Sequence, residues 1–83
     1  MVRDEIWSVS LEKATAFFEA QRDLAKTEDG FVFRSCRISL QELPSKDSAK
    51  WHMPRIRLFI EGPDEDVANI YHRFFIQFLT AGG

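Results

Sequence analysis

The stretch RIRLFIEG, from Arg55 to Gly62, alternates between two kinds of side chain, which is the pattern of a half-buried β-strand. One row is branched aliphatic and predicts the face toward the core: Ile56, Leu58 and Ile60. The other row mixes cations, an aromatic ring and an acid: Arg55, Arg57, Phe59 and Glu61. This second row places an aromatic ring next to arginines, so it is either a candidate binding surface or a solvated face with one aromatic side chain.

A helix is predicted directly after this strand. Gly62 and Pro63 interrupt the strand pattern, and residues 64–66 supply three carboxylates that complement the positive end of a helix dipole. The helix then shows one apolar stripe at helical spacing: Val67, Ile70, Tyr71, Phe74 and Phe78.

A strand and a helix are also predicted at the start of the chain. Residues 4–9 alternate too briefly to show which face is inner. Ser10 is a suitable N-cap for a helix whose stripe runs to Ala25 and whose stop signal is Gly30. The stripe consists of these residues: Ala14, Phe17, Phe18, Gln21, Leu24 and Ala25.

The middle of the chain predicts a second strand over residues 31–40, and its alternation changes phase. Phe31 and Phe33 share one phase, whereas Cys36 and Ile38 share the other. A β-bulge near residues 34–35 explains the change; alternatively, Phe31 lies in a turn and Phe33 points outward. Residues 41–50 are polar, contain a proline and predict a long hairpin loop.

The resulting order of strand, helix, strand, strand and helix predicts an α+β fold of the ferredoxin-like plan without its last strand. A right-handed crossover gives a three-stranded antiparallel sheet of order 1-3-2 with both helices on one face. At 83 residues the chain forms a single domain, residues 1–83. This fold carries many functions and implies none by itself.

The run FIEGPDEDVANIY, residues 59–71, resembles the strand-to-helix segment of blue-light flavin domains and of several ferredoxin-like binding families. In those flavin domains an N-terminal tyrosine and later amide side chains hold the chromophore. Here Trp7 stands in the first strand and Asn69 lies on the predicted helix. We therefore predict no cofactor.

Composition indicates an ordinary globular protein. The net charge is −2, no apolar run is long enough to span a membrane, and no basic segment precedes an apolar one as in a secretion signal. Cys36 is the single cysteine, so no internal disulfide can form, and a reducing, cytoplasmic location is expected. His52 and His72 lie on different elements without ligand spacing, so no metal site is expected. No residue pattern indicates a catalytic nucleophile or a phosphate-binding loop, and we predict that the protein is not an enzyme.

Two surfaces are candidate binding sites. The first is the outer face of the sheet, where arginines alternate with rings: Arg37, Trp51, Arg55, Arg57 and Phe59. The second is a flank of the last helix, where large apolar residues exceed what one inner stripe can bury: Phe75, Ile76 and Leu79. The first strand would also be an open sheet edge, which pairing with a second copy would cover.

We therefore predict a small protein-interaction or regulatory module that forms a homodimer and binds a protein partner. One alternative is a weak single-stranded nucleic-acid binder, because arginine and aromatic side chains contact phosphates and stack on bases. A second alternative is a small-molecule sensor at a dimer interface.

Overall fold

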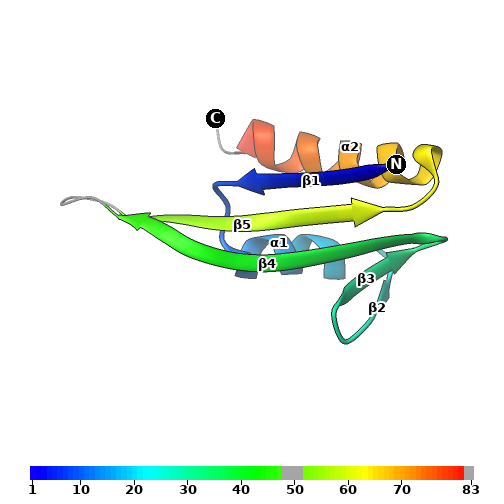
Figure 1. Cartoon of the computed structure of the whole chain (residues 1–83), viewed down its shortest axis with the longest axis horizontal. Coiled ribbons are helices and arrows are strands. Elements are labelled where there is room, and N and C mark those ends of the chain that lie inside the picture. The colour runs from blue at the N-terminus through cyan, green and yellow to red at the C-terminus, as the bar shows by residue number, and fades with distance from the viewer. Residues whose placement is uncertain (48–51, 82–83) are drawn as a thin grey trace.

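A computed structural model describes residues 1–47 and 52–81, so the predicted surface residue Trp51 lies outside the described residues. Five strands form one antiparallel sheet of order β1-β5-β4-β3-β2, accompanied by two helices (Figure 1). The elements in chain order are β1 (Val2–Trp7), α1 (Leu11–Glu19), β2 (Ala25–Lys26), β3 (Gly30–Phe33), β4 (Cys36–Asp47), β5 (His52–Glu61) and α2 (Asp64–Ala81). The α+β class is confirmed, whereas the prediction of a three-stranded ferredoxin-like sheet of order 1-3-2 is wrong.

A hairpin at residues 34–35 is the main reason for the error. Phe33 pairs with Cys36, so Arg34 and Ser35 form a two-residue turn between β3 and β4. Arg34 has a φ of 57°, a left-handed conformation that is uncommon outside glycine. The change of phase is therefore a chain reversal, and both explanations offered from the sequence are wrong: no bulge lies there, and Phe31 and Phe33 are both buried.

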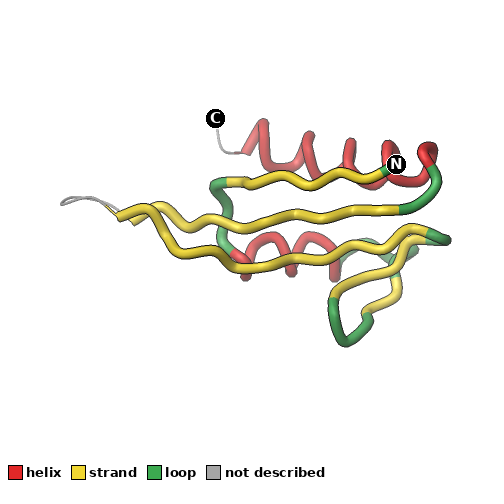
Figure 2. The backbone as a smooth tube through the Cα atoms, viewed as in Figure 1, coloured by secondary structure: helices red, strands yellow, loops and turns green. Residues whose placement is uncertain are grey.

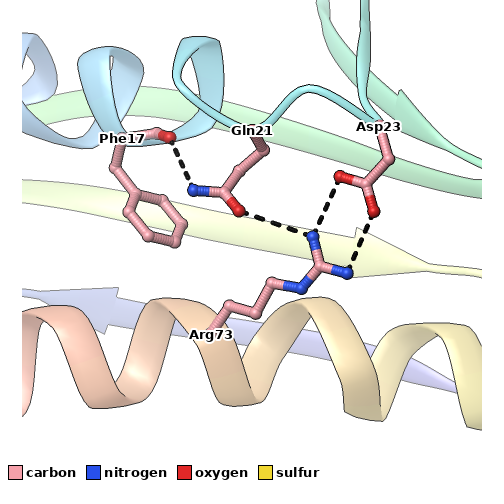
Figure 3. A network of polar contacts seen from close by, with 4 residues as sticks. All are labelled: Phe17, Gln21, Asp23 and Arg73. Atoms are coloured by element: carbon pink, nitrogen blue, oxygen red, sulfur yellow. Dashed lines mark hydrogen bonds and ion pairs between the residues drawn. The ribbon is translucent and has the colours of Figure 1, made fainter.

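The first helix ends earlier than its apolar stripe predicts. α1 stops at Glu19, and Ala25 and Lys26 instead pair with β3 as the short strand β2. The side chain of Gln21 donates to the backbone oxygen of Phe17, one of the last carbonyls of the helix, which also accepts from the Ala20 amide (Figure 3). This side chain therefore acts in the termination of the helix and not in its inner stripe.

The predicted loop over residues 41–50 is strand for most of its length. β4 continues to Asp47, and its pairing with β5 shifts register between Leu43 and Lys46. Pro44 lies in this irregularity, where β3 no longer pairs with β4, so its missing N–H removes no ladder bond. The extended β4–β5 ribbon projects beyond the rest of the sheet (Figure 2).

The core lies between the sheet and the two helices, which pack on the same face. Aliphatic residues of β5 and β4 meet Phe18 of α1 and Phe74 of α2, whose rings stack at 5.5 Å. The fully buried large side chains are these: Phe18, Phe33, Phe74, Ile38, Ile56, Leu58, Ile60, Ile70, Val67 and Cys36. The other face of the sheet carries no helix among the described residues, which leaves the row of Arg57 and Phe59 open.

Candidate protein-binding surface

The β1 strand forms a free edge of the sheet. Of the described strands, only β5 pairs with it. The Met1 amine donates to the Gly62 oxygen, and the Gly62 amide donates back to Met1. Antiparallel ladders alternate, so Arg3, Glu5 and Trp7 continue this bonding toward β5. The backbone groups of the intervening residues therefore point away from the sheet: Val2, Asp4 and Ile6.

Apolar side chains surround this edge. Val2 and Ile6 are 58% and 62% exposed on the outer sheet face. On the helix face, α2 exposes Phe75 by 36% and Leu79 by 54%. The Phe75 ring lies 6.0 Å from the Trp7 ring, which connects the helix flank to β1. We call this area the edge surface: the free edge of β1 with Val2, Asp4, Ile6, Phe75 and Leu79.

A polar cluster on the helix face fixes α2 against β1. The Glu5 carboxylate accepts hydrogen bonds from Tyr71 Oη at 2.7 Å, Arg3 Nη1 at 2.8 Å and Trp7 Nε1 at 3.2 Å. The Arg3 guanidinium also lies 4.0 Å from the centre of the Tyr71 ring. Partial burial works to raise the pKa of Glu5, but these donors outweigh it and the pKa lies below its ordinary value. Burial and the Glu5 carboxylate raise the pKa of Tyr71.

The arginines of the outer sheet face are already engaged within the chain. Arg57 forms a two-pronged ion pair with Asp4, and Arg37 pairs with Glu61. Arg55 donates twice to the backbone oxygen of Pro44. The hydrogen bond from Arg57 is the main cause that lowers the pKa of Asp4. Arg37 and Arg57 are thus paired with carboxylates, whereas Arg55 is hydrogen-bonded to a neutral carbonyl oxygen.

Phe59 lies among these arginines without forming a deep site. Its ring is half-buried, and the Arg57 guanidinium lies 5.9 Å from the ring centre. A hollow of about 270 Å³ is lined by Ser39, Gln41, Arg57 and Phe59. The structure therefore brings together the described members of the predicted sheet surface, and two of its arginines, Arg37 and Arg57, are paired with acids.

A groove of about 690 Å³ runs between α1 and the C-terminal half of α2. Its walls include Val9, Phe17 and Phe78. Two of its polar side chains already have backbone partners: Ser10 accepts from the Lys13 amide, and Gln21 donates to the Phe17 oxygen. The groove therefore offers apolar surface but few polar groups to orient a small ligand.

Other chemistries have little support among the described residues. No three metal-ligating side chains converge in residues 1–47 and 52–81. Cys36 is buried, and burial followed by the charges of Asp66 and Glu61 raises the pKa of its thiol, so the reactive thiolate is disfavoured. Within the described chain, neither helix is both long and apolar enough to cross a membrane.

The structure thus distributes the predicted site residues over two surfaces. The helix-flank residues Phe75, Ile76 and Leu79 are exposed; Phe75 contacts Trp7 of β1, and Leu79 lies one helical turn after Phe75. Sequence reasoning missed the contribution of Val2 and Ile6 and the cluster around Glu5. The spacing of Arg3, Glu5 and Trp7 at every second residue was the available signal, but it did not show which row faced the helices.

Comparison with protein-family models, with curated proteins and with solved structures finds no match to this chain.

Proposed function

We propose that this chain is a small protein-binding module that acts by association and not by catalysis, and that the edge surface is its binding site. The observation that supports this proposal is the coincidence of unpaired backbone groups on β1 with exposed apolar side chains on both sides of the strand. Sheet edges of this kind pair readily with other chains, and natural proteins usually shorten or cover them.

The opposite edge of the sheet provides a comparison within the molecule. There the outermost strand, β2, has two residues and its side chains are Ala25 and Lys26. A short edge strand with a lysine is protected against pairing with the strands of other chains. β1 has six residues and exposes Val2 and Ile6, so the two edges differ in the way expected if only β1 has a binding role.

A capture experiment with matched variants tests the proposal. The immobilised chain is incubated with an extract of its source cells, and bound proteins are compared among wild type, Ile6→Glu with Leu79→Glu, and Asn69→Glu. Asn69 is exposed on α2 but lies outside the edge surface, so its variant controls for added charge on the helix. We expect proteins that wild type and Asn69→Glu retain and the double variant loses. Identical recovery with all three chains, or no recovery at all, contradicts the proposal.

A further inference from the structure

The groove between the two helices is separate from the edge surface and shares no residue with it. Its floor is aromatic: the Phe17 ring lies 5.7 Å from the Phe78 ring, and the Phe17 side chain is directed from α1 toward α2 (Figure 3). Val9 also lines the groove and packs against the core. With a volume of about 690 Å³ and an apolar floor, the groove has the size and character of a small-ligand site.

Two small side chains keep this groove open. Ala16 and Ala20 line its α1 wall, four residues apart on one face of the helix, and both are exposed. Lys13 lies one turn before Ala16 on the same face, so the wall from Lys13 to Ala20 is about 10 Å long at the helical rise per residue. The groove therefore accommodates an apolar body of this length with Lys13 at one end.

The charge of the groove comes from Lys13, the only charged side chain among the described residues that line it. Most other cations of the described chain are held by a carboxylate or a carbonyl oxygen. The Lys13 ammonium group forms no ion pair or hydrogen bond with the part of the chain that the structure describes. The groove thus combines apolar surface with one positive charge that no described acid balances.

We infer that this groove is a second binding site and that its ligand is a medium-chain carboxylate. The carboxylate group lies at Lys13, and the hydrocarbon chain runs past Ala16 over the rings of Phe17 and Phe78. The inference goes beyond the proposed function and is independent of it, because the groove and the edge surface have no residue in common.

The polar groups of the groove specify this class of ligand. The Lys13 ammonium group has three N–H donors and no acceptor, so it binds an oxygen anion. One cation balances one negative charge, which fits a carboxylate, whereas a phosphate monoester would leave its second charge unbalanced. Gln77 adds an amide group on the α2 wall. Because the other polar groups are few, the ligand is mostly hydrocarbon, and burial of its chain against the two rings supplies the affinity.

A titration of the full, isotope-labelled chain with sodium decanoate, followed by NMR below the micelle concentration, tests the inference. We expect saturable shifts at the amides of Ala16, Ala20 and Gln77, with a dissociation constant of about 1 mM or tighter. The absence of saturable shifts there, or shifts confined to Val2 and Ile6 of the edge surface, overturns the site. Decyltrimethylammonium has the same chain and the opposite charge, so it should bind several-fold more weakly. Equal binding of the two compounds overturns the assignment of an anionic ligand.

The role of Lys13 is tested by a matched pair of variants. Lys13→Gln should weaken decanoate binding about two- to fivefold, which corresponds to the loss of one exposed ion pair. Arg22→Gln removes a positive charge from an exposed position that does not line the groove, and it should bind decanoate as wild type does. If the two variants bind decanoate equally well, Lys13 does not hold the carboxylate and this part of the inference is wrong.

Variants that fill the groove test its location. Ala16→Leu and Ala20→Leu each place a larger side chain in the groove from an exposed position, and leucine is also a good helix former. We expect each to weaken decanoate binding about tenfold or more, with circular dichroism showing that the chain stays folded. Ala68→Leu is the control, because Ala68 is exposed on α2 away from the groove. Folded filling variants that bind decanoate as the control does would place the ligand elsewhere and overturn the inference.

Discussion

Gly30 lies at the start of β3, where the absence of a side chain is a structural requirement. A Cβ atom at this position would lie 2.0 Å from the carbonyl oxygen of Ile38, an atom of the neighbouring strand backbone. We expect Gly30→Ala to lower the free energy of unfolding by about 2–3 kcal/mol, because β3 must move away from β4 to relieve the overlap. Urea unfolding followed by circular dichroism measures the change, with exposed Asp29→Ala as the control. An unchanged midpoint for Gly30→Ala would contradict this account of the strand pair.

Glu5 makes the stability of the β1 edge depend on pH. The pKa of Glu5 is lowered in the folded chain. Its charged carboxylate therefore stabilises the fold above the ordinary glutamate pKa of about 4.3, and this stabilisation is lost as the pH falls toward the pKa of Glu5 in the folded chain. We expect wild type to lose more stability than Glu5→Gln between about pH 5 and pH 3. Thermal unfolding of both chains across this range tests the prediction. If the stability of wild type and of Glu5→Gln changed equally with pH, the hydrogen bonds from Tyr71, Arg3 and Trp7 would not favour the charged carboxylate.

At the scale of elements, α2 is tied to the segment after α1 by one arginine. Arg73 donates to both carboxylate oxygens of Asp23 at 3.0 Å and to Gln21 Oε1 at 3.4 Å (Figure 3). Its guanidinium also lies 5.0 Å from the centre of the Phe33 ring. We expect Arg73→Lys to cost about 1 kcal/mol, because an ammonium group cannot reproduce the two-pronged geometry. Denaturant unfolding against exposed His72→Ala measures this cost, and equal stability of the two variants would contradict it.

The outer sheet face gives a second prediction at this scale. Because Arg37 and Arg57 are paired with carboxylates, we expect single-stranded oligonucleotides to bind more weakly than about 10⁻⁴ M at physiological salt. Fluorescence anisotropy of a labelled oligonucleotide measures the affinity. Asp4→Asn with Glu61→Gln should strengthen binding by freeing both arginines. Tight, salt-dependent binding by wild type that is lost in Arg55→Ala with Arg57→Ala would instead favour nucleic-acid recognition.

Elements that are determined by neighbouring residues could be predicted from the sequence, whereas elements that depend on distant residues could not. β5 and α2 are determined by local alternation, by the carboxylates of the first helical turn and by an apolar stripe, so both were predicted close to their actual positions. The turn at Arg34 was missed because arginine has no propensity for its left-handed conformation. The early end of α1 was missed because Arg73, a distant residue, holds the segment that follows.

The candidate site also has one part that the sequence predicted and one part that it did not. The surplus of large apolar residues on α2 was visible in the sequence, since one inner stripe cannot bury Phe75 and Leu79 as well. The orientation of β1 was not visible, because its inward row contains Arg3 and Glu5. Those charges are satisfied by Tyr71, 66 residues away from Glu5, and only the folded chain reveals this partner.

At the scale of the whole molecule, the free edge of β1 has a consequence for oligomeric state. The sequence predicts a homodimer formed across the β1 edge, and among the described strands only β5 pairs with β1, so that edge is free to accept a second copy. We therefore expect the molar mass to rise above the 9.7 kDa of one chain as the concentration increases. Light scattering over a wide range of concentrations measures this mass.

Two variants show which surface is used if a dimer does appear. A dimer lost in Asp4→Pro and retained in Asp4→Ala would mean that β1 pairs with β1, because only proline removes the outward N–H of this position. A dimer lost in Leu79→Glu and retained in Asp4→Pro would place the contact on the flank of α2, leaving the backbone groups of β1 free. The mass of one chain at every concentration would contradict the prediction of a dimer, because neither the β1 edge nor the flank of α2 would then bind a second copy.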